Sequence, residues 1–223
     1  MPTERGVAAT RARFARGGHE RLRQLAASLI AALACLGMSA AGGATQPVTL
    51  PSLERVYVNP EPRPITDFVL TDHQGRERRF SSLHGQPVLV LFGFTHCPDV
   101  CPPTLLRLRA LHEAQGGELR AAQIVMISVD GDRDTPSAMK AFLASFSPDF
   151  IGLTGDPRIA TTIAAQFSAV FFKEPAGKDG NYKVGHSGQV FVVDKQGRLR
   201  ASFVDASIDD MAKVVELLIQ ERS

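Results

Sequence analysis

Two hydrophobic patterns recur along this sequence, one typical of buried strands and one typical of helices with a single apolar face. Unbroken apolar runs at residues 88–92 and 124–129 predict strands that are buried on both faces. Leucines recur at intervals of three from Leu105 to Leu111, which predicts a helix with one apolar face. A second amphipathic helix is expected at residues 208–219. Strands that alternate with helices indicate an α/β domain.

Short polar signals mark where further elements begin. Thr135 and Asp156 each precede a proline, which is the pattern of a helix N-cap followed by proline at the first helical position. These helices should run to about Phe146 and Gln166. Hairpins are expected at residues 68–80 and 190–204. The order strand, helix, strand and then a closing hairpin and helix predicts a thioredoxin-like domain over residues 64–223, with a central mixed sheet flanked by helices.

The first 44 residues have the pattern of a targeting segment. Six arginines occur up to Arg23, and residues 25–41 then carry no charge. A basic flank followed by an apolar run predicts a signal peptide or a membrane anchor. Three fates stay open for it, namely cleavage after Ala44, retention as an anchor, and lipidation at Cys35. A buried core helix is the structural alternative.

The basic flank also predicts topology and location. Arginines beside an apolar segment stay on the cytoplasmic side, so the remainder of the chain should be exported. We therefore expect residue 64 onward to lie in a bacterial-type periplasm, tethered to the inner membrane by residues 1–44. Residues 45–63 contain four prolines and little apolar pattern, and we interpret them as a linker that holds the domain away from the membrane.

Composition and charge narrow the class of protein. Hydrophobic residues make up 44% of the chain and charged residues 22%, which allows a core without a disulfide framework. The net charge is only +2, whereas nucleic-acid-binding domains usually have a strong basic excess. Nucleic acid is therefore excluded as the expected partner.

The candidate chemistry lies in one cysteine pair. With Cys35 in the targeting segment, the exported part holds Cys97 and Cys101. Outside the cytosol such a pair can form a structural disulfide, bind a metal, or alternate between the two. Each cysteine precedes a proline, which disfavours helical backbone, so the next helix should begin near Pro103. Both sulfurs would then lie at a helix N-terminus, which favours thiolate.

Thiolate ligands narrow the choice of metal. Soft sulfur selects copper(I) or zinc over magnesium and calcium. Structural zinc requires four ligands, whereas two or three suffice for copper(I). A third, imidazole ligand would keep the site usable when the copper is oxidised to copper(II).

Two of the six histidines are candidates for that imidazole. His96 adjoins Cys97, but consecutive residues in extended backbone point in opposite directions, so His96 should face away from that sulfur. His186 lies in the segment Gly185-His186-Ser187-Gly188, in a loop expected just before the strand at Val190. The small residues beside His186 would allow another loop to approach closely.

The cysteine segment FGFTHCPDVCPPTL resembles the copper motif of the SCO/SenC family of cytochrome oxidase assembly proteins. Further segments are similar to the family in the same order, at residues 127–136, 152–155 and 182–187. The resemblance covers about residues 64–220. It implies a thioredoxin-like, membrane-anchored protein that binds copper(I) or copper(II).

Carried over to this sequence, the resemblance implies that Cys97, Cys101 and His186 are the metal ligands, and that the two cysteines can also form a redox-active disulfide. The implied partner is cytochrome c oxidase subunit II, and the implied role is to help load copper into its binuclear copper centre. Family members commonly have proline where this chain has Gly131, and we expect the loop there to be more flexible.

Two functions remain open from the sequence. The first is a copper metallochaperone, and the second is a thiol-disulfide oxidoreductase that reduces the cysteines of a partner protein. Three residues separate Cys97 from Cys101, whereas thioredoxin-type redox sites favour two, and the wider gap suits two ligands that converge on one ion. Asp130 and Asp134 can be interpreted as an acid/base pair or, preferably, as capping residues before the next helix.

Overall fold

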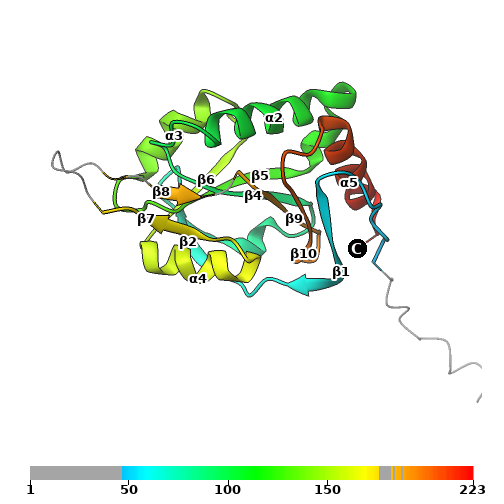
Figure 1. Cartoon of the computed structure of the whole chain (residues 1–223), viewed down its shortest axis with the longest axis horizontal. Coiled ribbons are helices and arrows are strands. Elements are labelled where there is room, and N and C mark those ends of the chain that lie inside the picture. The colour runs from blue at the N-terminus through cyan, green and yellow to red at the C-terminus, as the bar shows by residue number, and fades with distance from the viewer. Residues whose placement is uncertain (1–46, 176–181, 183, 187, 223) are drawn as a thin grey trace, which may run out of the picture. The chain divides into compact units, whose positions relative to one another are not determined.

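An eight-stranded mixed sheet forms the centre of the domain, with strand order β1-β10-β9-β4-β5-β6-β2-β3 (Figure 1). The computed structural model describes residues 47–175, 182, 184–186 and 188–222, but not the side chain of His186. Strands β4, β5 and β6 are parallel to one another, and all other neighbours are antiparallel. The strands are β1 (Val56–Pro64), β2 (Val69–Asp72), β3 (Glu77–Arg79), β4 (Val88–Gly93), β5 (Gln123–Ser128), β6 (Ile151–Thr154), β9 (Val190–Val193) and β10 (Arg198–Phe203).

Helices cover both faces of this sheet. In Figure 1, α2 and α3 lie above the sheet and α4 lies below it. A two-stranded antiparallel sheet, β7 (Phe171–Lys173) with β8 (Val184–His186), is separate from the large one. The helices are α2 (Cys101–Glu113), α3 (Pro136–Ala144), α4 (Pro157–Phe167) and α5 (Ile208–Gln220), with short 3₁₀ turns η1 (Phe80–Leu83) and η2 (Ala114–Ala121). The α/β class with a mixed sheet flanked by helices is confirmed.

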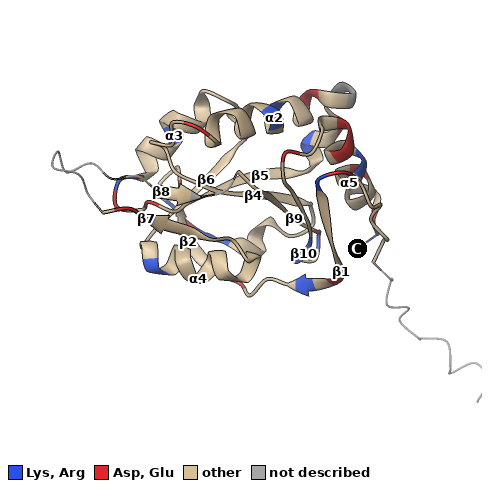
Figure 2. Ribbon diagram, in the orientation of Figure 1, with Lys and Arg blue, Asp and Glu red and all other residues tan. Residues whose placement is uncertain are grey.

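The apolar run at residues 88–92 forms the central strand β4, as predicted. Leu89 and Leu91 pack into one core with α2, α3 and α5. Val90 and Phe92 pack into the other core, where the ring centroid of Phe92 lies 5.3 Å from that of Phe167 in α4. Figure 2 shows no charged residue on β4 or β5, in agreement with strands that are buried on both faces.

The expected helix starts are correct at α3 and α4. The side chain of Thr135 accepts a hydrogen bond from the backbone N–H of Ala138, and that of Asp156 accepts one from Arg158. Both caps therefore satisfy N–H groups that the first turn leaves without a helical partner. By contrast, the prediction that the cysteine-loop helix begins near Pro103 is wrong, because α2 begins at Cys101. Prolines are tolerated in a first turn, where no N–H is needed.

The segment interpreted as a linker contributes a strand to the sheet. Within residues 45–63, β1 begins at Val56 and pairs antiparallel with β10 over two short stretches, with a register shift between Val58 and Arg63. Leu50 is buried in the core. The three prolines of β1, at residues 60, 62 and 64, suit this position because an edge strand can lose donors that a central strand cannot. A free spacer therefore does not extend as far as residue 63.

The predicted signal or anchor at residues 1–44 lies outside the described residues. Across the residues that the structure does describe, no helix is both long and apolar enough to span a membrane.

Candidate metal centre

The two cysteines meet where β4 passes into α2. The backbone N–H of Cys101 donates to the sulfur of Cys97, with a nitrogen–sulfur distance of 3.4 Å. Both cysteines are buried, with 5% of Cys97 and 0% of Cys101 exposed. The N-terminus of α2 thus directs a donor at Cys97 and stabilises negative charge on that sulfur.

The sequence predicted that both cysteines form thiolates readily, but the surroundings of Cys101 oppose this. The hydrogen bond with Cys97 and complete burial both raise the pKa of Cys101, and the nearby charge of Asp134 adds to the effect. The sulfur of Cys101 can be buried beside β4 because residue 93 is a glycine. A Cβ at Gly93 would lie 2.6 Å from this sulfur. Gly93 was not identified from the sequence as a site residue. Its signal was a glycine at the end of a buried strand, which often marks close packing.

A pocket of about 290 Å³ opens beside Cys97. One wall comes from the cysteine loop and the other from the segment that contains β8. The lining residues are Phe94, His96, Cys97, Pro98, Asp99, Val100, Glu174, Tyr182, Val184 and Gly185. The cysteine loop and β8 are therefore neighbours, although they are separated by more than eighty residues of sequence.

His186 ends β8, where its backbone pairs with Phe171 of β7, rather than lying in a loop as expected. Gly185 on one side of it lines the pocket with Cys97. On the other side, a Cβ added to Gly188 would lie 3.6 Å from the Cβ of Val100 in the cysteine loop. The backbone on both sides of His186 thus lies beside the cysteine loop, while the side chain itself is outside the description.

His96, the rival imidazole, lies at the edge of the same pocket. Its side chain is 59% exposed, and its Nδ1 lies 3.0 Å from the hydroxyl of Thr95 and 3.9 Å from the carboxylate of Asp134. The structure therefore brings His96 into the same pocket as Cys97 but directs Nδ1 toward Thr95 and Asp134.

Asp134 connects the cysteine loop to the end of β5. It is 0% exposed, and its carboxylate accepts hydrogen bonds from the Thr95 backbone N–H, the Thr95 hydroxyl at 2.6 Å and the Ser128 hydroxyl at 2.7 Å. Capping of α3 falls instead to Thr135. The sequence favoured a capping role for Asp134 and gave no signal for Thr95.

Asp130 has different partners. Its carboxylate accepts a hydrogen bond from the hydroxyl of Tyr182 at 2.5 Å and pairs with the guanidinium of Arg133. Burial and this hydrogen bond raise the pKa of Tyr182, so the phenol stays protonated as the donor. Asp130 and Asp134 therefore serve two separate groups of contacts, which fits neither an acid/base pair nor a pair of caps.

The sequence predicted a more flexible loop at Gly131, but the structure packs this residue against another backbone segment. A Cβ at that position would lie 1.8 Å from the backbone carbonyl oxygen of Gly155. The two backbones approach too closely for any other residue. The loop between β5 and α3 is therefore packed tightly against the end of β6.

Two of the three proposed metal ligands are among the side chains that the structure describes. No group of three or more His, Cys, Asp or Glu residues that could hold a metal occurs among the side chains that the structure describes. The two sulfurs supply two soft ligands, and the side chain of the third candidate, His186, is not among those described.

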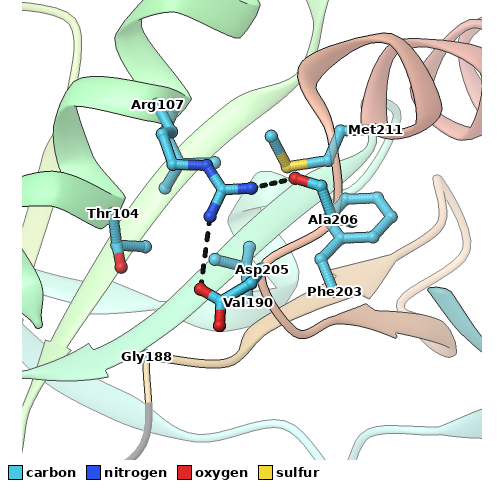
Figure 3. A pocket seen from close by; sticks show the side chains of 9 residues that line it. Thr104, Arg107, Gly188, Val190, Phe203, Asp205, Ala206 and Met211 are labelled. Carbon is cyan, nitrogen blue, oxygen red and sulfur yellow. Dashed lines mark hydrogen bonds and ion pairs between the residues drawn. The ribbon is translucent and has the colours of Figure 1, made fainter. Parts of the chain in front are cut away.

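A second cavity lies between α2 and the segment that precedes α5 (Figure 3). Arg107 donates to the carbonyl oxygen of Ala206 and reaches the carboxylate of Asp205 at 3.4 Å. The cavity measures only about 10 Å³, which is room for about one water molecule. This cavity is a small packing gap between the two elements rather than a ligand site.

Comparison with known proteins decides the family. The family model described as SCO1/SenC matches residues 59–220, which is most of the chain. The chain belongs to the SCO1/SenC family. The resemblance of the cysteine motif is thereby confirmed at the level of the family.

Relatives of known sequence and structure agree with this assignment. The SCO2 homolog of Bos taurus mitochondria is 38% identical over 135 residues, which cover 59% of this chain and 50% of that protein. The chain thus matches only about half the length of this relative. A SCO2-like protein of Rickettsia conorii is 35% identical over 148 residues, covering 65% of this chain and 72% of its own length.

Among solved structures, Bradyrhizobium japonicum ScoI with copper bound is 35% identical and has a TM-score of 0.64. The match covers 70% of this SCO1/SenC chain and 99% of that one. The thioredoxin-like fold predicted from the order of strands and helices is therefore correct.

Proposed function

We propose that this chain is a copper-binding protein whose ligands are the sulfurs of Cys97 and Cys101 and the imidazole of His186. The observation that carries the proposal is the adjacency of the two cysteines, with the Cys101 nitrogen 3.4 Å from the Cys97 sulfur, beside a pocket that Gly185 also lines. Two neighbouring thiols form a soft donor pair, which suits copper(I). The copper-bound structure of the Bradyrhizobium japonicum relative supports the choice of metal.

The histidine makes the proposed site suitable for both oxidation states. Copper(I) is satisfied by two thiolates, whereas copper(II) prefers nitrogen ligands as well. The backbone of His186 lies next to Gly185, which lines the same pocket as Cys97.

We further propose that the bound copper is cargo, delivered to the binuclear copper centre of cytochrome c oxidase subunit II. The similarity of the cysteine motif to that of the oxidase assembly proteins supports this acceptor. Delivery would take place in the periplasm, with the arginine-rich N-terminal segment as the tether to the inner membrane. Cys97 lines the pocket, so an acceptor that enters this pocket would meet one ligand there.

The alternative function, reduction of a disulfide in a partner protein, is favoured by one observation. The N–H of Cys101 stabilises negative charge on Cys97, and thiolate is the form that attacks a disulfide. This chemistry has no requirement for His186. The two functions can therefore be separated by substitution of that histidine.

Copper titration of the full-length protein tests the proposal. Wild type should bind one copper ion per chain, and Cys97→Ser should lose binding. His96→Ala is the matched control, because it removes the rival imidazole from the same pocket and should keep binding. Binding of two or more ions per chain, or binding that survives loss of both cysteines, contradicts the proposal.

A further inference from the structure

The loop from Val129 to Thr135, between β5 and α3, contacts both walls of the pocket beside Cys97. We infer that two acidic residues of this loop position the two halves of the proposed copper site, with Asp134 holding the cysteine-bearing half and Asp130 holding the histidine-bearing half. The inference rests on the proposed function, because it assigns these residues a role in the geometry of that site.

Asp134 acts on the cysteine-bearing half through Thr95, which lies two residues before Cys97. The Thr95 N–H is 3.1 Å from one carboxylate oxygen, and the Thr95 hydroxyl is 2.6 Å from the other. Hydrogen bonds to a charged, fully buried acceptor are stronger than those between neutral groups. The start of the cysteine loop is therefore fixed at two atoms of one residue.

Asp130 acts on the other half through Tyr182, which lies four residues before His186. Besides the bond from the Tyr182 hydroxyl, the guanidinium of Arg133 lies 3.8 Å from the centre of the Tyr182 ring and donates to the Tyr182 carbonyl oxygen at 3.3 Å. The ammonium group of Lys173, from β7, lies 3.7 Å from the same ring centre. Tyr182 is thus held by its hydroxyl, its ring and its backbone.

The loop itself provides a firm base for both contacts. The N–H of Asp134 donates to the carbonyl oxygen of Asp130 at 2.9 Å, and the hydroxyl of Thr154 donates to the carbonyl oxygen of Asp134 at 2.6 Å. Gly131 packs against the backbone of Gly155. The two acids therefore keep a fixed relation to each other, and through them the two halves of the site do so as well.

The separate roles of Asp134 and Asp130 predict different changes in copper affinity when each is disturbed. Asp134→Asn places an amide NH₂ among three donors, so at least one donor loses its acceptor and the cysteine half loosens. Tyr182→Phe removes only the hydroxyl that reaches Asp130. Substituting a residue that orients a metal ligand typically weakens metal binding 10- to 100-fold, so Asp134→Asn should weaken both copper(I) and copper(II) by about that factor. Tyr182→Phe should weaken copper(II) by about tenfold and leave copper(I) within about twofold.

The experiment measures copper(I) and copper(II) affinity of the full-length protein for Asp134→Asn, Tyr182→Phe, Thr95→Val and Thr95→Ser. Thr95→Ser keeps the hydroxyl and should retain wild-type binding, whereas Thr95→Val should behave as Asp134→Asn does. Two matched controls exist. Asp72→Asn removes another buried carboxylate, in the β2–β3 hairpin, and Tyr57→Phe changes an exposed tyrosine on β1. Both controls should keep wild-type copper affinities.

A metal-free measurement separates failure of this inference from failure of the proposed function. Amide hydrogen exchange should rise at residues 94–101 in Asp134→Asn and at residues 184–186 in Tyr182→Phe, with no change at the other segment. Wild-type protein that fails to bind copper but shows this exchange pattern overturns the proposed function and keeps the positioning roles. Hydrogen exchange that is unchanged in both variants, or raised equally at both segments, overturns the inference. Copper affinities that stay at the wild-type value in both variants also overturn it.

Discussion

Gly93 lies directly beneath the sulfur of Cys101, so that a Cβ at this position would come within 2.6 Å of that sulfur. Gly93→Ala should therefore displace Cys101, weaken copper binding and destabilise the fold by about 1–3 kcal/mol through overpacking. Copper titration and denaturant unfolding measure the two effects.

Gly152→Ala is the control for this prediction. Its added Cβ would meet Leu143 and Met139 at 2.8 and 3.0 Å, in the core against α3 and away from the sulfurs. It should lower stability by a similar amount while copper affinity stays at the wild-type value. Equal copper affinities in the two variants would show that Gly93 has no specific role at the site.

Gly131→Ala should destabilise the protein, because its Cβ would lie 1.8 Å from the carbonyl oxygen of Gly155 and backbone cannot yield as a flexible side chain can. Overpacking of this kind costs about 1–3 kcal/mol, and the loss should appear in the free energy of unfolding. The neighbouring exposed substitution Asp132→Ala should have a much smaller effect. A Gly131→Ala variant as stable as wild type would mean that the loop is not packed against β6 as described.

Stability should fall with pH below about 6.5 because of His112. Burial lowers the pKa of His112 in the folded protein, although its Nε2 lies 2.8 Å from the carbonyl oxygen of Ala122. The unfolded chain thus binds a proton at higher pH than the folded chain does, and stability is lost as pH drops through the unfolded pKa. Denaturant unfolding at pH 8 and pH 5.5 measures this slope. His112→Gln should flatten it, and an unchanged slope would contradict the assignment.

Arg200 links β10 to both ends of the domain. Its buried guanidinium donates to Asp194 at 3.1 Å, to Glu221 at 2.9 Å and to the carbonyl oxygen of Val48. Arg200→Met leaves the buried carboxylate of Glu221 without its cation and leaves Asp194 with Arg198 alone, so it should cost about 3–5 kcal/mol of unfolding free energy. Arg55→Met, which removes exposed ion pairs with Glu54 and Asp205, should cost about 0–1 kcal/mol. Similar losses for both would contradict a structural role for the buried network.

Elements that depend on local signals could be predicted from the sequence. The run at residues 88–92 is a buried strand because its apolar residues are continuous, and α3 and α4 begin where a cap precedes a proline. Strand β1 was missed because its pairing with β10 joins segments about 140 residues apart, and its prolines suit an edge position that only the assembled sheet defines.

The same distinction applies to the site. Cys97 and Cys101 stand out because their spacing and flanking prolines are local. Thr95 and Gly93 could not be assigned a role, because their importance comes from contacts with Asp134 and Cys101 that exist only after the loop has folded. Asp134 lies at the expected start of a helix, which suggested a cap, whereas in the folded chain its carboxylate contacts Thr95 and Ser128.

The central claim is that His186 completes a copper site with Cys97 and Cys101, and His186→Ala tests it most directly. Two thiolates alone tend to reduce copper(II), with one disulfide formed for every two copper(II) ions that become copper(I), whereas copper(I) itself needs fewer ligands. The full-length variant should therefore lose stable copper(II) binding, keep weakened copper(I) binding, and fail to support oxidase assembly, while its reduction of a model disulfide stays near wild type. Copper(II) affinity equal to that of wild type in metal titrations of His186→Ala would contradict the account.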